Sequence, residues 1–322
     1  MALNFIQQNS RKPMESNYRF TVFTSCFNSE SFINRLYESL KGQSFSNFEW
    51  LIVDDCSEDL TREILKNIEK DAPFDIRIFH NDSNQMIASC CNFAVNNARG
   101  QFFLFLDHDD ELVPNALERF DQIWQNIGQA KKAKLVGMMS NCQDQFGNYV
   151  HDELPEPPLI TDFYSLYYNL GVRGEKFFCY LTSILKEYNF STVDRYVPEN
   201  VMLLNISDDY DTYFFNENLR IYHINQENHE SLADKLADGW KIAFPKGMRH
   251  AKLEDLNRRP RKMISQPILF LKTIINFTRF SLHSDILLKN TFQDIHNPIL
   301  KIFAFFLSPV SVILYFRDKA KQ

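Results

Sequence analysis

Residues 102–110, Phe-Phe-Leu-Phe-Leu-Asp-His-Asp-Asp, join an apolar run directly to an acidic cluster. Successive apolar residues of this kind are typical of a strand buried on both faces, as inside a parallel sheet. Asp107, Asp109 and Asp110 fall where that strand must end, and carboxylates this close together need a compensating charge. Hard oxygen ligands there suit Mg²⁺ or Mn²⁺, which commonly accompanies a bound diphosphate. The alternative is a solvated acidic turn.

Strands and helices are expected to alternate through the first half of the chain. The expected strands are residues 19–24, 48–53, 76–79, 102–106 and 134–140, and the expected helices are residues 29–43, 87–98, 114–127 and one capped by Asp59. This order predicts an α/β fold, with a mostly parallel sheet and helices on both of its faces.

Polar residues follow each of the first four expected strands. They occupy residues 24–28, 54–55, 81–84 and 107–110. In an open parallel sheet the carboxyl ends of the strands meet at one edge, and ligands bind in the crevice outside that edge. The sequence therefore predicts that these four turns converge on one binding site.

Composition excludes several classes of site. The chain has 322 residues and only nine glycines, and no two glycines form a Gly-x-Gly pair. Both the dinucleotide fingerprint and the phosphate-binding P-loop need closely spaced glycines. The six cysteines show no Cys-x-x-Cys spacing, and residues 1–16 are polar without an apolar run. We therefore expect reduced thiols in a cytosolic protein, without a secretory signal, a zinc site or disulfides.

Charge is distributed unevenly along the chain. Residues 1–245 carry 21 basic and 36 acidic side chains, whereas residues 246–322 carry 14 basic and 5 acidic ones. A basic tail indicates an anionic partner, and the richness of this tail in Phe, Ile and Leu favours a membrane surface over nucleic acid. We expect a polar leader (1–18), an α/β domain (19–245) and a basic, apolar helical region (246–322).

The last apolar run, residues 298–316, is interrupted by Lys301 and bent by Pro309. Its length is borderline for a membrane span, which needs about 20 apolar residues. Helices at 267–280 and 299–316 lying in the membrane interface are the favoured interpretation, with the basic residues 258–262 as a second anchor. A soluble helical pair packed on the rest of the protein is the alternative.

Three stretches of the sequence resemble the family 2 glycosyltransferases. They are residues 20–28 (Phe-Thr-Val-Phe-Thr-Ser-Cys-Phe-Asn), 48–57 (Phe-Glu-Trp-Leu-Ile-Val-Asp-Asp-Cys-Ser) and 103–110. The resemblance covers roughly residues 18–225, and residues 172–219 are similar to a bacterial subgroup that builds surface polysaccharides. It implies the GT-A fold, which is Rossmann-like, and nucleotide-sugar-dependent transfer.

The resemblance also implies the reaction and its setting. A sugar would pass with inversion from a nucleotide-diphosphate sugar, expected to be UDP-linked, to a hydroxyl of a growing or lipid-linked glycan. Mg²⁺ or Mn²⁺ would be the cofactor. The enzyme would work in the cytoplasm, attached peripherally to the inner face of the cell membrane.

Individual residues match positions with roles in that family. The nucleotide-sugar contacts implied are Thr24, Cys26 and Asn28 at the base, Asp55 on uracil N3–H, Asp107 at the ribose, and Asn84 and Ser89 further along. Asp107, Asp109 and Asp110 match the D-x-D element that holds the metal. Glu199 matches the catalytic base. Asn28 and Glu199 can instead simply cap helices, and Asn84 can simply close a turn.

One departure from the family pattern concerns the diphosphate. Residues 84–92 contain neither a glycine nor a basic residue, both of which the family often has there. The diphosphate would then depend on the metal ion, on helix amides and on Ser89. Two rival functions remain. One is a sugar-1-phosphate nucleotidyltransferase, although such enzymes carry a Gly-rich basic loop after the first strand and residues 25–28 do not resemble it. The other is a non-catalytic membrane-bound partner with the same fold.

Overall fold

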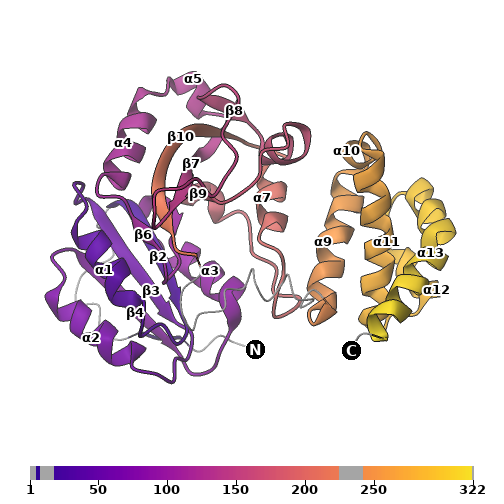
Figure 1. Ribbon diagram of the computed structural model, residues 1–322, viewed down its shortest axis with the longest axis horizontal. Coiled ribbons are helices and arrows are strands. Elements are labelled where there is room, and N and C mark those ends of the chain that lie inside the picture. The colour runs from indigo at the N-terminus through magenta and orange to yellow at the C-terminus, as the bar shows by residue number, and fades with distance from the viewer. Residues whose placement is uncertain (1–4, 8–17, 225–241, 321–322) are drawn as a thin grey trace. The chain divides into compact units, whose positions relative to one another are not determined.

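The computed structural model describes residues 5–7, 18–224 and 242–320 (Figure 1). The chain divides into two compact units. The first comprises Met1–Asn189 and Met202–Glu227, and the second comprises Phe190–Val201 and Asn228–Gln322. The grouping of residues 190–201 with the C-terminal unit was not predicted.

The described strands of the first unit form one mixed sheet. In chain order they are β1 Phe5–Gln7, β2 Tyr18–Cys26, β3 Phe48–Asp54, β4 Asp75–Asn81, β5 Gly100–Phe105, β6 Glu111–Leu112, β7 Leu135–Asp144, β8 Leu159–Thr161, β9 Lys176–Leu181 and β10 Asp211–Tyr222. Their order across the sheet is β1-β4-β3-β2-β5-β9-β7-β10-β6, and β8 pairs with β10. Strands β4, β3, β2 and β5 are parallel to one another, as predicted. Strand β1 lies in the expected polar leader and was not predicted.

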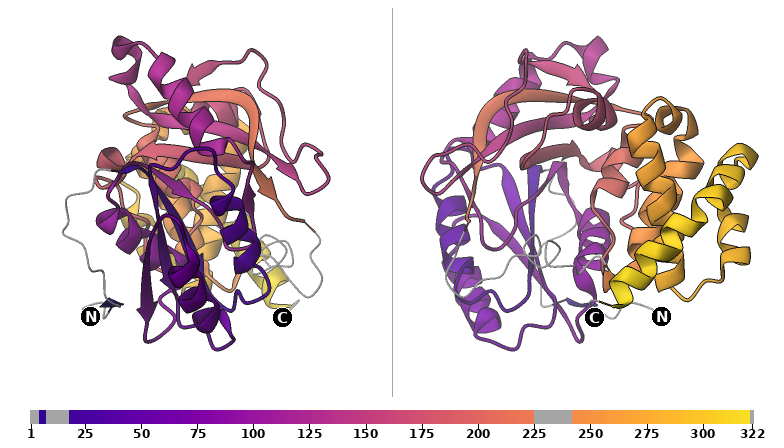
Figure 2. Two further views of the ribbon diagram at one scale, coloured as in Figure 1. Left: turned by 90° about the vertical axis from the view of Figure 1, so that its left-hand side faces the viewer. Right: turned by 45° about the vertical axis from the view of Figure 1, so that its right-hand side comes forward.

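Helices cover both faces of the parallel part of the sheet (Figure 2). The helices of this unit are α1 Ile33–Lys41, α2 Thr61–Asp71, α3 Met86–Asn97, α4 Ala116–Asn126, α5 Gln129–Lys132, the π-helix η1 Ser165–Asn169 and α6 Thr182–Leu185, while α7 Asn200–Ile206 begins at the boundary between the units. Helices α1, α2 and α4 share one apolar cluster with Phe20, Trp50 and Phe102, whose side chains are fully buried. Helix α3 packs on β2 and β3. The apolar faces of these helices therefore cover both faces of the buried strands, whose continuous apolar sequences require such cover.

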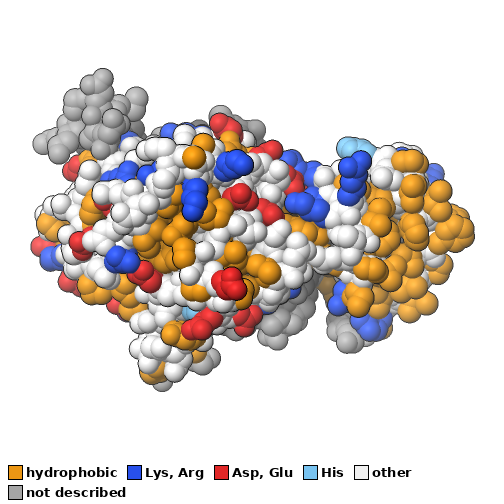
Figure 3. Space-filling view, turned by 90° about the horizontal axis from the view of Figure 1, so that it is seen from above, with side chains coloured by type: hydrophobic (Ala, Val, Ile, Leu, Met, Phe, Trp, Pro, Cys, Tyr) orange, Lys and Arg blue, Asp and Glu red, His pale blue; other side chains and the backbone are white. Residues whose placement is uncertain are grey.

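The second unit is helical. The helices among its described residues are α9 Pro245–Arg258, α10 Pro260–Ile264, α11 Pro267–His283, α12 Leu288–Thr291, the 3₁₀ turn η3 Phe292–Asp294 and α13 Pro298–Lys319. Among the described residues, α13 is the helix long and apolar enough to cross a membrane, with a mean hydropathy of 2.1 over its best window. Hydrophobic side chains gather on the surface of this unit (Figure 3).

A buried ion pair supports the amino-terminal end of the parallel strands. Glu49 on β3 accepts hydrogen bonds from Arg77 Nε at 2.9 Å and Nη2 at 3.0 Å. The hydroxyl of Thr21 and the backbone N–H of Arg99 also donate to this carboxylate, at 2.7 and 2.8 Å. Both charged side chains are almost wholly buried. Every oxygen of the carboxylate is thus paired inside the protein.

Replacing Glu49 with Ala is expected to lower the free energy of unfolding by about 3–5 kcal/mol, because the variant leaves the Arg77 guanidinium buried without its counter-ion. Urea denaturation of the purified variant measures this change. The control is Lys41→Ala, which removes an ion pair with Asp71 on the protein surface and is expected to have little effect. A loss for Glu49→Ala no larger than that of the control would contradict the importance of the buried pair.

Candidate active site

The loops that follow β2 and β3 are joined to each other at the carboxyl edge of the sheet. Asn28 adopts a left-handed conformation with φ of 52°, which asparagine tolerates better than most residues. Its backbone N–H donates to Ser57 Oγ at 3.0 Å, and its Oδ1 accepts from the backbone N–H of Glu58 at 2.9 Å. The exposed Asn28 side chain therefore lies at the edge of the predicted site and also holds the two loops together there.

Asp54 and Asp55 have different surroundings. Asp54 is a brace, because its carboxylate lies 2.6 Å from Arg62 Nε and 3.1 Å from His80 Nδ1, and these partners help to lower its pKa against the effect of burial. The buried Asp55 carboxylate accepts hydrogen bonds from Asn81 Nδ2 and from the backbone N–H groups of Gln85 and Met86, at 2.7, 2.7 and 2.8 Å. Asp55 thus ties the end of β3 to the start of α3.

Two of the predicted nucleotide contacts are placed differently from the expectation. The side chains of Thr24 and Cys26 are both 0% exposed. Thr24 Oγ1 accepts a hydrogen bond from the indole N–H of Trp50 at 3.0 Å, and burial raises the pKa of the Cys26 thiol. Neither side chain reaches the surface in this structure, so they serve the core beneath the site.

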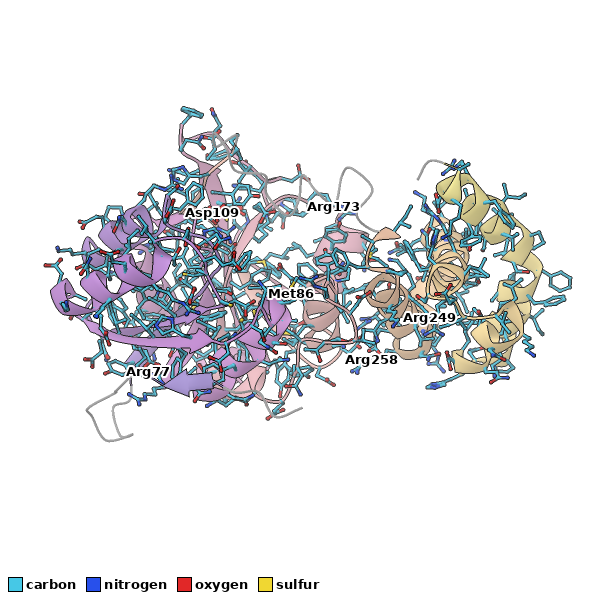
Figure 4. All side chains as sticks on the ribbon, turned by 90° about the horizontal axis from the view of Figure 1, so that it is seen from below. Arg77, Met86, Asp109, Arg173, Arg249 and Arg258 are labelled. Atoms are coloured by element: carbon cyan, nitrogen blue, oxygen red, sulfur yellow. The ribbon has the colours of Figure 1, made fainter. Side chains whose placement is uncertain are left out.

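Asn84 and Ser89 lie on the α3 side of the same edge. The Asn84 side chain is exposed, and its Oδ1 accepts from the backbone N–H of Met86 at 3.2 Å, closing the turn into α3. Ser89 is half-buried on the first turn of that helix. Figure 4 shows Met86, at the start of α3, together with Asp109. The four polar turns therefore come from neighbouring strand ends, as the sequence predicted.

The acidic turn after β5 contains carboxylates in three different environments. Asp107 is the most exposed, at 59% of its side chain, and lies 3.5 Å from Arg220 Nη2. The backbone carbonyl of Asp109 accepts a hydrogen bond from Arg35 on α1. Asp110 is buried, and one of its oxygens lies 2.7 Å from Arg220 Nε. The other accepts from the backbone N–H of His223 at 3.1 Å.

Arg220 on β10 supplies the compensating charge that the cluster needs. It is itself buried, and besides Asp110 and Asp107 it lies 3.8 Å from Glu175. Burial raises the pKa of Asp110, and the Arg220 charge opposes that rise. Asp110, one of the three carboxylates expected to hold a metal ion, therefore faces Arg220 in this structure. Within the described ranges, no set of three or more His, Cys, Asp or Glu side chains is arranged to hold a metal ion.

Glu199 lies in the segment Phe190–Val201, which belongs to the second compact unit. It is exposed and directly precedes α7. Burial, together with the nearby Glu199 charge, raises the pKa of Tyr196 to about 12. The structure therefore does not bring Glu199 together with the acidic turn within one unit.

The sheet, its polar carboxyl edge and the acidic turn define an open α/β fold, a class that binds ligands outside the carboxyl ends of its parallel strands. The sequence model described as "Glycosyl transferase family 2" matches residues 21–188, which is more than half of the chain. The chain therefore belongs to glycosyl transferase family 2. The matched region contains every residue of the polar edge discussed above except Arg220 and His223.

Two curated relatives are similar in sequence. An uncharacterised glycosyltransferase of Haemophilus influenzae is 33% identical over 123 residues, which are 38% of this chain and 39% of the relative. The Campylobacter jejuni GalNAc(5)-diNAcBac-PP-undecaprenol beta-1,3-glucosyltransferase is 26% identical over 220 residues, covering 66% of this chain and 67% of that protein. The alignment thus spans about two fifths of the length of the first of these relatives.

Solved structures share the fold at low sequence identity. Staphylococcus aureus TarS has a TM-score of 0.62 at 16% identity, covering 92% of this chain and 54% of that chain. The Pyrobaculum calidifontis mannosyltransferase PcManGT, solved with GDP-Man and Mn²⁺, has a TM-score of 0.51 at 12% identity, covering 96% and 86%. These similarities confirm the predicted GT-A fold.

Proposed function

We propose that this chain is an inverting glycosyltransferase of bacterial surface-polysaccharide synthesis. The donor is a nucleotide-diphosphate sugar, UDP-linked, and the acceptor is a hydroxyl of a growing or lipid-linked glycan. The observation that carries this proposal is the acidic turn at the carboxyl edge of the parallel strands, in a chain of this family. TarS has been solved with UDP-GlcNAc, and the Campylobacter relative is named for an undecaprenol-linked substrate.

Donor binding is assigned to the carboxyl edge of β2 to β5. The nucleotide base lies by the loop of Asn28, and Asp55 accepts a hydrogen bond from that base. Asp55 already accepts three hydrogen bonds, and a carboxylate can accept more than three. Asn84 and Ser89 border the diphosphate side. Residues 19–245 form the transferase domain in this proposal.

Asp107 and Asp109 are the residues that would hold Mg²⁺ or Mn²⁺. They fit such an ion because both supply hard oxygen donors and neither is buried, Asp107 being exposed and Asp109 half-buried, whereas the Asp110 carboxylate is buried against Arg220. A divalent ion bound there would neutralise charge on the departing diphosphate. Arg220 keeps the turn in place by pairing with Asp110 and by lying close to Asp107.

Glu199 is assigned the catalytic base. Its carboxylate takes the proton of the acceptor hydroxyl while that oxygen bonds to the anomeric carbon and the bond to the diphosphate breaks. A single displacement inverts the anomeric centre, so no enzyme nucleophile is needed. The nucleoside diphosphate leaves with the electron pair of the broken bond.

Residues 246–322, which lie in the second unit, are assigned to the membrane. Nucleotide sugars are cytosolic, so peripheral attachment to the inner face of the cell membrane would bring lipid-linked acceptors within reach of the donor site. A screen of nucleotide sugars for hydrolysis that depends on Mg²⁺ or Mn²⁺ tests the proposed function, since hydrolysis needs no acceptor glycan.

A further inference from the structure

Helix α13 exposes large apolar side chains to the surface and buries two polar ones. The side chains that it buries are Leu300, Ala304, Ser311 and Asp318. Its exposed side chains include Ile302, Phe305, Phe306, Ile313 and Phe316, of which Phe306 is 72% and Ile313 67% exposed. We call these five residues the outer face of α13. A helix on a water-exposed surface normally buries its apolar side and exposes its polar side.

The polar groups on the inner side of α13 are satisfied by α11. Ser311 Oγ donates to the backbone carbonyl of Ile275 at 3.0 Å. The Asp318 carboxylate accepts from Arg279 Nη2 at 2.7 Å and lies 3.0 Å from His283 Nε2. Small and polar residues facing a neighbouring helix, with large apolar residues turned outward, are typical of helices packed in lipid.

A side chain of α13 replaces the helical hydrogen bond that its proline removes. Pro309 has no N–H, so the backbone carbonyl of Phe305, four residues earlier, lacks its helical hydrogen bond. The hydroxyl of Ser308 donates to that carbonyl at 2.7 Å. Water would solvate such a carbonyl on an aqueous surface, whereas in hydrocarbon the partner must come from the protein itself.

The charges around the outer face favour an anionic bilayer. The single acidic residue of α13, Asp318, is buried in its ion pair with Arg279. The remaining charged side chains of the helix, Lys301, Arg317 and Lys319, are all basic. Each basic side chain near a cytoplasmic leaflet strengthens attraction to anionic headgroups.

The packing of α13 against its neighbouring helix limits how deeply α13 can insert into a membrane. The outer face spans about 100° of the helix circumference, and the exposed side chains of Ile299 and Val310 next to it widen the apolar arc to about 140°. The opposite side rests on α11, which in turn packs on α9, where Arg249 Nε donates to Ser281 Oγ at 2.9 Å (Figure 4). A helix covered along one side by other helices suits the membrane interface and not a span.

We propose that the outer face of α13 inserts into the acyl-chain boundary of an anionic membrane, with the helix axis in the membrane plane. This inference rests on the membrane attachment in the proposed function and deepens it by naming the inserting surface. It does not depend on catalysis, because lipid binding is measured without a donor sugar.

The test is flotation of the full chain with vesicles of phosphatidylcholine, with and without about one third phosphatidylglycerol. The wild-type protein is expected to float with the anionic vesicles and to be released by alkaline carbonate. The double variant Phe306→Glu/Ile313→Glu is expected to lose at least about tenfold in vesicle partitioning, because two charges enter the inserted face. Leu170→Glu, which places a charge on an exposed apolar residue of the first unit, is the matched control and should bind as the wild type does.

Three outcomes would overturn the proposal. Undiminished vesicle binding by the double variant would show that another surface carries the attachment. Wild-type protein that resists carbonate and needs detergent would indicate a span. A wild-type oligomer that ignores vesicles and becomes a monomer in the double variant would show that a second copy of the chain covers the face. If nucleotide-sugar hydrolysis is absent while flotation succeeds, only the proposed chemistry fails.

Discussion

The Asp109→Ala variant is expected to lose sugar transfer and metal-dependent nucleotide binding while keeping its fold. The carboxylate that is removed is one of the two assigned to the metal ion. Arg35 bonds to the backbone carbonyl of Asp109, so the substitution leaves this link between α1 and the acidic turn in place. Calorimetric titration of UDP in the presence of Mn²⁺ measures binding, and circular dichroism measures the fold.

The matched control for this variant is Asp71→Ala, which removes an exposed carboxylate at the end of α2. It should bind UDP and turn over as the wild type does. Full activity in purified Asp109→Ala would contradict the assignment of the metal to this turn.

Glu199→Gln is expected to bind the nucleotide sugar normally and to lose at least about 10²-fold in kcat, the usual scale for the removal of a general base. The amide keeps the size of the side chain but cannot take the acceptor proton. Turnover is measured by release of the nucleoside diphosphate under saturating donor, and binding by calorimetry. Glu187→Gln, on the surface of the first unit, is the control.

Unchanged turnover in Glu199→Gln would show that Glu199 is not the catalytic base and only precedes the start of α7. Asp194 and Asp208 would then be the next acidic residues to replace. Asp194 already has a structural contact, because its Oδ2 accepts a hydrogen bond from the backbone N–H of Gly247 at 2.9 Å.

The parallel half of the fold could be predicted because its signals are local. The run at residues 48–53 is buried along its whole length, and the observed strand β3, Phe48–Asp54, exceeds the prediction by a single residue. The polar turns then converge because parallel strands necessarily end at one edge. No comparable local signal exists for residues 190–201, whose place in the second unit involves contacts such as that between Asp194 and Gly247.

The electrostatics of the site could not be predicted, because they depend on contacts across long sequence separations. The acidic cluster indicated that a counter-charge was needed, but Arg220 meets Asp110 from strand β10, far along the chain. The burial of Thr24 likewise depends on the indole of Trp50 from the neighbouring strand. Composition showed that residues 298–316 are apolar, yet only the packing shows which side of α13 faces outward.

The screen of nucleotide sugars tests the central claim most directly. Purified wild-type protein is incubated with UDP- and GDP-linked sugars in Mn²⁺ or Mg²⁺, with EDTA-treated samples and Asp109→Ala as controls, and the released nucleoside diphosphate is quantified. We expect slow hydrolysis of at least one UDP-linked sugar that stops with EDTA and is absent from the variant. Hydrolysis that continues in EDTA, or no release from any nucleotide sugar together with no binding of UDP, would contradict a metal-dependent nucleotide-sugar transferase.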